Sequence, residues 1–165
     1  MFITANTPFW RAVAAISAVT ATLALVPTAA SAGSCPANKI VPDGQGQKMN
    51  PAAAKSVTDK VLKRIDLVNE PVMLKDHALR LRRLVIKPGG IVPWHSHTDR
   101  PAIIYIITGT ITEYSSTCAA PIVHRAGEST AEVKGTSHWW KNSTRKTVVL
   151  LSADLFHDKD DPHTM

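Results

Sequence analysis

Two stretches decide the fold of this chain: GIVPWHSH at residues 90–97, and GTSHWWKN at residues 135–142. In the first stretch, His95 and His97 stand two positions apart, and on a β-strand such residues point to the same face. Their imidazoles then converge at a separation that one metal ion can bridge. The second stretch supplies His138, and closure of a β-barrel brings strands that are distant in sequence face to face. The spacing therefore predicts a metal site of three histidines.

Short β-rich runs separated by turn residues extend from Leu79 to Leu155 on both sides of these stretches. Strands at a spacing of about 8–12 residues are typical of an all-β sandwich or barrel. No segment in this region is long and periodic enough for a crossover helix, which argues against a parallel α/β fold. We expect one antiparallel β-barrel domain over residues 57–156.

The segments that flank this domain carry weaker signals. Residues 33–56 are rich in Gly, Pro, Ala, Asn and Gln, and we expect an irregular, poorly packed arm there. Val57, Val61 and Ile65 fit both a helical stripe and a strand, and of the two we favour a strand preceded by one helical turn. The polar residues 157–165 are expected to form a solvated tail.

The spacing of these residues resembles the two motifs of the cupins, in particular the small single-domain cupins of the quercetin-dioxygenase type. The first motif reads Gly, His-x-His, Glu and Gly; its matches are Gly90, His95, His97 and Gly109, with Ala102 where Glu is expected. The second motif reads Gly, Pro-x-Gly, His and Asn; its matches are Gly127, Gly135, His138 and Asn142, with Val133 where Pro is expected.

The resemblance implies an antiparallel jelly-roll β-barrel that holds one divalent metal ion through His95, His97 and His138. The glutamate ligand of the family has no counterpart, because the alanine at position 102 offers no donor atom. Glu113 and Asp99 could reach such a site only through an unusual local geometry.

Three neutral imidazoles suit several divalent ions, and the sequence does not distinguish Fe, Zn, Cu, Ni, Co or Mn. A site with three protein ligands leaves coordination positions for water, dioxygen or substrate, as catalytic sites do. The resemblance therefore implies a metal-dependent dioxygenase that acts on a small organic substrate. The alternative is a non-catalytic cupin module that binds a small ligand or a metal. No residue stands out as a general base, so the catalytic residues stay unknown.

Several side chains near the histidines are candidates for a substrate pocket: Trp94, Ile104, Trp140 and Asn142. The two tryptophans would form an aromatic wall, although such residues also fill the ends of barrels. His124 has no place in either motif, and we interpret it as an ordinary strand residue.

The first 32 residues have the pattern of a secretory signal peptide. Ala12 to Val26 is a run of fifteen residues without a charge, which is shorter than the roughly 20 apolar residues of a membrane-spanning helix. Ala30-Ser31-Ala32 then fits a cleavage site, so the exported chain should begin at Gly33 in the periplasm or outside the cell, without a membrane anchor. In that compartment Cys35 and Cys118 can form a disulfide, but the sequence leaves open whether they pair.

The chain carries 19 Lys and Arg against 13 Asp and Glu, a net charge of +6. Its densest basic stretch contains Arg80, Arg82, Arg83 and Lys87, and we expect it to be the solvated face of a strand. The stretch lacks the interleaved aromatic residues of single-strand nucleic-acid platforms, so no nucleic-acid partner is expected. The expected partner is a small molecule, and a homodimer stays open.

Overall fold

The computed structural model describes residues 33–157. The predicted signal peptide and residues 158–165 of the predicted tail lie outside these residues. Within the described part, no helix is long and apolar enough to cross a membrane.

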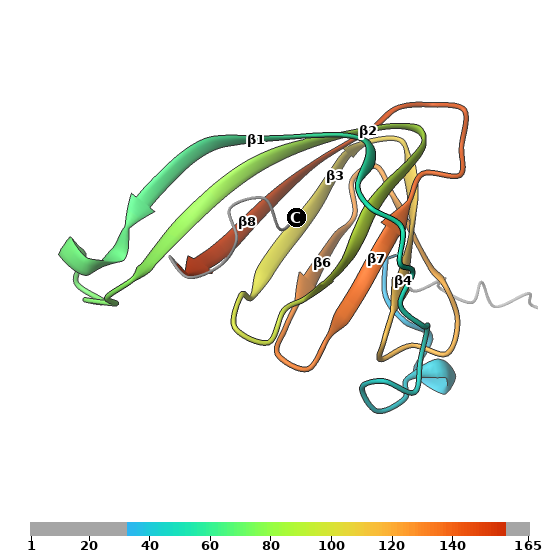
Figure 1. Cartoon of the computed structure of the whole chain (residues 1–165), viewed down its shortest axis with the longest axis horizontal. Coiled ribbons are helices and arrows are strands. Elements are labelled where there is room, and N and C mark those ends of the chain that lie inside the picture. Colours follow the sequence, from blue (N-terminus) through green and yellow to red (C-terminus); the bar gives the residue numbers. More distant parts are fainter. Residues whose placement is uncertain (1–32, 158–165) are drawn as a thin grey trace, which may run out of the picture.

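The described residues form a nearly closed antiparallel β-barrel, which confirms the predicted all-β class (Figure 1). The strands are β1 Lys55–Asp66, β2 His77–Ser96, β3 Ala102–Thr108, β4 Thr110–Ser115, β5 Ile122–Arg125, β6 Ser129–Glu132, β7 Ser137–Lys141 and β8 Val148–His157. They pair in the order β5-β4-β7-β2-β8-β3-β6, and β1 pairs with β2 outside this path.

Alternating burial along the strands separates the barrel interior from the surface. From Ala78 to Ile86 every even-numbered residue of β2 is buried, and all odd-numbered residues except the half-buried Leu81 and Val85 are exposed. This is the two-residue period of a strand with one face toward a core. The apolar core comprises Leu84, Ile86, Val92, Ala102, Ile104, Ile106, Ile111, Trp140, Val148 and Leu150.

The long strand β2 turns sharply at Gly89-Gly90, which separates its core-forming half from the half that carries the histidines. A Cβ atom at residue 90 would lie 2.6 Å from Ile86 Cγ2 and 2.8 Å from the carbonyl oxygen of Lys87. Only glycine permits this approach, so the first glycine of the motif has a structural role.

Beyond the barrel, β1 and parts of β2 and β8 extend together as a twisted sheet (left in Figure 1). The strand predicted for the segment around Val57 is β1, which begins at Lys55. The expected helical turn is wrong in position. It follows the strand as the 3-10 turn Leu67–Asn69.

The prediction of a solvated basic strand is wrong for Arg80 and Arg82, which are only 4% and 5% exposed. Arg80 donates to both carboxylate oxygens of Asp154, at 3.0 and 2.8 Å. Arg82 pairs with Asp154 and with Asp59. The acidic partners lie on the neighbouring strands β8 and β1. The pairing of these strands with β2, which the sequence alone does not show, compensates the buried charges.

The arm before β1 is irregular, as predicted, but it is held against the loop after β4. A disulfide joins Cys35 to Cys118. Beside it, the amide of Gly46 donates to the carbonyl of Ser116 at 2.8 Å, and Ala119 donates to Lys39 at 2.8 Å. The disulfide and the backbone hydrogen bonds together tether the arm, while most of its residues stay exposed.

Candidate metal centre

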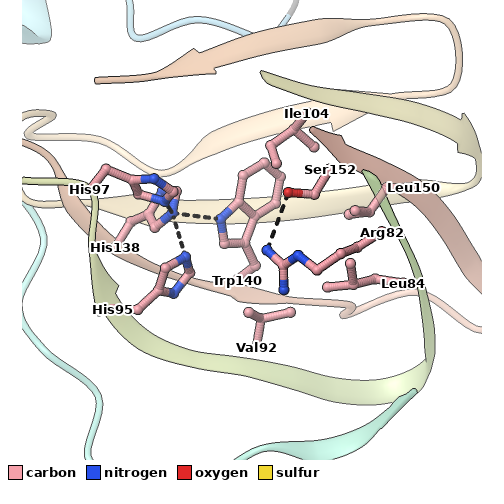
Figure 2. Close-up of a pocket in the computed structure, with 10 residues that line it drawn as sticks. All are labelled: Arg82, Leu84, Val92, His95, His97, Ile104, His138, Trp140, Leu150 and Ser152. Atoms are coloured by element: carbon pink, nitrogen blue, oxygen red, sulfur yellow. Dashed lines mark hydrogen bonds between the residues drawn. The ribbon is translucent and has the colours of Figure 1, made fainter. Parts of the chain in front are cut away.

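Two of the three predicted histidines lie on paired strands, and the third directly follows one of these strands. His95 belongs to β2 and is the register partner of His138 on β7, and His97 follows directly after β2. All three side chains are buried. Their rings contact one another edge to face, with centroids 4.6 to 5.0 Å apart, so the structure brings together the residues that the spacing singled out (Figure 2).

A β-bulge in β2 directs His95 and His97 into the barrel. The register between β2 and β7 shifts between Val92 and His95. Even-numbered residues face inward up to Val92, but after the bulge the inward positions are His95 and His97. Such a shift moves side chains to the opposite face of a strand, and bulges commonly re-aim residues at functional sites.

The bulge also explains the position of Trp94, which is half-buried. The residues that line the barrel pocket are Arg82, Leu84, Val92, His95, His97, Ile104, His138, Trp140, Leu150 and Ser152. The predicted pocket residues Ile104 and Trp140 are among them, but Trp94 and Asn142 are not. Asn142 instead donates to the carbonyls of Ile86 and Lys146, at 2.9 and 2.8 Å, and so braces the turn after β7.

Hydrogen bonds fix the tautomer of each histidine. Nδ1 of His95 lies 2.9 Å from the carbonyl oxygen of Pro93, and Nδ1 of His97 lies 2.7 Å from that of Arg100. Nδ1 of His138 lies 2.7 Å from Oε1 of Glu113. Each of these oxygens only accepts hydrogen bonds, so in each ring the proton sits on Nδ1 and the lone pair on Nε2.

The three Nε2 atoms converge on one point. Nε2 of His138 lies 3.0 Å from Nε2 of His97 and 3.1 Å from Nε2 of His95. Nitrogen ligands about 2.0–2.1 Å from a metal ion lie roughly 2.9 Å apart in octahedral and 3.4 Å apart in tetrahedral geometry. These two distances fall within this range, and the ligand atoms of all three histidines lie within 4.8 Å of one another, so the donor set fits a divalent metal ion.

The electrostatic environment keeps two of the ligands neutral. Burial, together with the neighbouring His138, lowers the pKa of His95 well below its ordinary value and that of His97 to about 4. Burial alone would lower the pKa of His138 too, but the carboxylates of Glu132 and Glu113 raise it. A neutral imidazole is the form that binds metal, so His95 and His97 are ready to coordinate at neutral pH.

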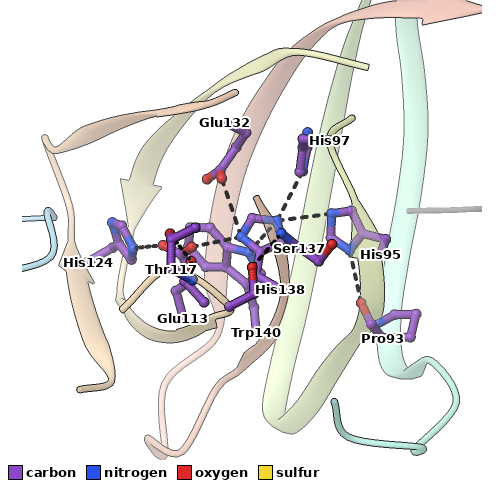
Figure 3. Close-up of polar contacts among 12 residues, drawn as sticks. Pro93, His95, His97, Glu113, Thr117, His124, Glu132, Ser137, His138 and Trp140 are labelled. Atoms are coloured by element: carbon purple, nitrogen blue, oxygen red, sulfur yellow. Dashed lines mark hydrogen bonds and ion pairs between the residues drawn. The ribbon is translucent and has the colours of Figure 1, made fainter. Parts of the chain in front are cut away.

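Behind His138 lies a buried relay that the sequence did not reveal (Figure 3). Glu113 accepts from His138 Nδ1 through one oxygen and contacts His124 Nε2 through the other, at 2.7 and 2.8 Å. Burial alone would raise the pKa of Glu113, but these hydrogen bonds lower it to about 2. Glu113 therefore does not coordinate from the Nε2 side, as the sequence analysis considered, but orients a ligand from behind.

His124 is thus not the ordinary strand residue of the prediction. It is fully buried and stacks on Trp140, with ring centroids 4.5 Å apart. Asp99, by contrast, is exposed. The available signal was the two-residue period of β4 and β5, which places Glu113 and His124 at inward positions.

A second buried carboxylate approaches the same ring. Oε2 of Glu132 lies 3.3 Å from Nδ1 of His138, and Oε1 has no hydrogen-bond partner among the described residues. Burial and the neighbouring Glu113 raise the pKa of Glu132 to about 7, although His138 opposes this shift. No signal near Glu132 in the sequence marks it as a site residue.

Comparison with known proteins agrees with this architecture. The family model described as "Cupin domain" matches residues 82–154. Among curated proteins, none matches the chain in sequence.

Several solved structures are similar to the chain. A predicted oxalate decarboxylase from Thermotoga maritima is similar with a TM-score of 0.50 and 19% identity, over 74% of this chain and 98% of that chain. The Cnp3 cupin domain of Schizosaccharomyces pombe gives 0.48 and 14%, over 64% and 69% of the two chains. An oxalate oxidase in complex with the substrate analogue glycolate gives 0.49 and 18%, over 68% and 56%.

Proposed function

The chain carries a cupin domain over residues 82–154, and we propose that this domain binds one divalent metal ion through His95, His97 and His138 and acts as a dioxygenase on a small organic substrate. The observation that carries the proposal is the convergence of three Nε2 lone pairs whose tautomers are fixed from behind. Imidazole lone pairs that converge on one point form a site for a cation.

The pocket supports a substrate next to the metal rather than a closed structural site. Its cavity is small, about 30 Å³, and borders open solvent, so it would admit only a small ligand. The histidines lie at one end, Arg82 and Ser152 at the other, and Trp140 and Ile104 lie between them (Figure 2). Apolar walls with a few polar groups are typical of small-ligand sites.

A bound metal would supply activation of dioxygen, of water or of a substrate oxygen. The chain itself would hold and orient the substrate. Trp140 and Ile104 would exclude water, and the indole Nε1 of Trp140, which lies 3.3 Å from His138 Nε2, would limit the space beside the metal. The guanidinium of Arg82 donates to Ser152 at 3.2 Å and would present the polar end of the pocket.

We also propose that the protein works outside the cytoplasm, in the periplasm or as a secreted protein. The pairing of Cys35 with Cys118 supports this location, because disulfides persist in oxidising compartments. The leader pattern of residues 1–32 is the sequence basis for the proposal.

Ala102 favours a second candidate, a cupin module without turnover that binds a small ligand or a metal. It stands where the family has a carboxylate ligand, and its methyl group cannot coordinate. Loss of a ligand can weaken a site until only the fold is retained.

The test is elemental analysis of metal-depleted protein after incubation with Zn(II), Cu(II), Ni(II), Mn(II) or anaerobic Fe(II). We expect about one ion per chain and a sharp loss in each of His95→Ala, His97→Ala and His138→Ala. His77→Ala is the matched control, because His77 lies on the sheet extension outside the pocket. Binding of none of these ions would refute the metal site. If metal binds, oxygen consumption by the metal-loaded protein with small carboxylic acids, thiols and phenols would distinguish an enzyme from a binding module without turnover.

A further inference from the structure

The carboxylate missing at residue 102 has a counterpart on the neighbouring strand. Ala102 on β3 is the register partner of Glu132 on β6. Directly paired residues of antiparallel strands point to the same face of the sheet, and both are buried here, with Glu132 only 2% exposed. Glu132 therefore brings a carboxyl group into the barrel one strand away from the position where the family carries it.

The contacts of Glu132 provide no hydrogen bond to its buried carboxylate. The single proton on Nδ1 of His138 is donated to Glu113 at 2.7 Å, so the contact of Glu132 with the same nitrogen at 3.3 Å is not a second hydrogen bond. Its other oxygen, Oε1, is buried without a partner in the described part of the chain. A buried carboxylate in such a position is costly unless a proton or a cation compensates it.

We infer that Glu132 supplies the carboxylate ligand of the metal centre in place of residue 102, so that the ligands are three histidines and one glutamate from β6. The inference rests on the proposed metal site. Coordination requires the carboxylate of Glu132 to turn from Nδ1 of His138 toward the Nε2 side, because Glu132 is not among the residues that line the pocket of the three Nε2 atoms. An oxygen ligand added to three imidazoles suits Fe(II), Mn(II), Co(II) and Zn(II) better than Cu(I).

The paired register allows a direct test, because the carboxylate can be moved back across the pair. Metal-depleted wild type is compared with Glu132→Gln, Glu132→Ala, Ala102→Glu, and the swap that combines Ala102→Glu with Glu132→Ala. Dissociation constants are measured for Zn(II) by competition with a chromophoric chelator. The visible absorption spectrum of bound Co(II) reports the ligand set.

We expect Glu132→Gln and Glu132→Ala to weaken Zn(II) binding by more than about 100-fold, beyond the usual cost of losing an outer-sphere partner. The swap should restore affinity to within about tenfold of wild type, because it conserves both the charge and the volume of the pair. Glu132→Gln should also change the Co(II) spectrum, and this isosteric variant decides the question if the swap does not fold.

Glu113→Gln is the matched control, since Glu113 contacts the same nitrogen of His138 from behind the ring. Ala102→Glu should not rescue it, whereas it should rescue Glu132→Ala. Glu70→Gln, at an exposed position, should change nothing.

Three outcomes overturn the inference. Unchanged affinity and Co(II) spectrum in Glu132→Gln would mean that Glu132 is not a ligand. Equal rescue of the Glu113 and Glu132 variants would mean that Ala102→Glu simply adds a new ligand. Two ions per wild-type chain, of which Glu132→Gln removes only one, would place a separate site at Glu113, Glu132 and Nδ1 of His138. If the wild type binds no metal at all, it is the proposed function that fails.

Discussion

Replacement of Glu113 by glutamine tests whether the buried relay prepares His138 for metal binding. Glu113 is ionised and accepts hydrogen bonds from two buried imidazoles, at 2.7 and 2.8 Å. A glutamine can accept through its single carbonyl oxygen only, so its amide group must face one of the two imidazoles. If the amide faces His138, Nδ1 becomes an acceptor and the proton moves to Nε2, where it blocks the metal. If it faces His124, the tautomer of His138 survives but the charge is lost.

The size of the effect follows from these two arrangements. A hydrogen bond to a charged group is worth about 1.5–3 kcal/mol and a neutral one about 0.5–1.5 kcal/mol, so loss of the charge alone costs His138 about 1 kcal/mol. The change of tautomer costs more. We therefore expect Glu113→Gln to weaken Zn(II) binding by about 10–100-fold, the range found for outer-sphere partners of metal-bound histidines.

The assay is chelator competition at pH 7.5, with thermal unfolding of the metal-free proteins to show that each variant folds. His124→Gln removes the far end of the relay and should have a smaller effect than Glu113→Gln. A dissociation constant of folded Glu113→Gln within about twofold of wild type would refute the claim that the relay fixes the tautomer of His138.

The other predictions concern stability and processing. Reduction of the disulfide, or replacement of Cys35 and Cys118 by serine, should lower the free energy of unfolding by about 2–4 kcal/mol in denaturant titrations; no change would mean that the arm contributes nothing. The pKa of His97 is about 4 in the folded metal-free protein and about 6.5 in the unfolded chain. The unfolded chain therefore binds more protons between these values, and the stability of wild type relative to His97→Gln should fall by about 3 kcal/mol as the pH falls from 6.5 to 4; a flat difference would contradict the burial of a neutral ring. Asp154→Asn leaves two buried guanidinium groups less compensated and should cost about 3–5 kcal/mol, measured by chemical denaturation; a loss below about 1 kcal/mol would show that solvent reaches them. N-terminal sequencing of the exported protein should find Gly33 first, and retention of Met1 would contradict cleavage.

The sequence was sufficient for the barrel and for the convergence of the histidines, because both follow from local rules. Two histidines at positions i and i+2 share a strand face, and regular turn spacing indicates an antiparallel sheet. Side-chain direction around the bulge was not predictable in this way. The extra residue between Val92 and His95 inverts the alternation, and it turns Trp94 away from the pocket that the sequence assigned to it.

The polar groups around the site depend on register between strands that are far apart in sequence. Glu113 reaches His138 across β4 and β7, Glu132 faces Ala102 across β3 and β6, and Arg80 meets Asp154 across β2 and β8. The sequence does not reveal whether an inward-facing polar residue contacts water, an ion or a second side chain. This ambiguity explains why the sequence predicts a solvated basic strand and does not single out Glu132.

The three ligands are not equivalent, and the difference lies in what holds each Nδ1 proton. Backbone carbonyls hold those of His95 and His97, whereas a carboxylate holds that of His138. A carboxylate partner makes the imidazole a stronger electron donor than a neutral carbonyl does. His138 should therefore form the strongest of the three bonds to a metal, and it is the only one of the three whose strength can be tuned through the side chains behind it. Variation at Glu113 and His124 is consequently the route by which this barrel could adjust its metal centre while the histidines stay in place.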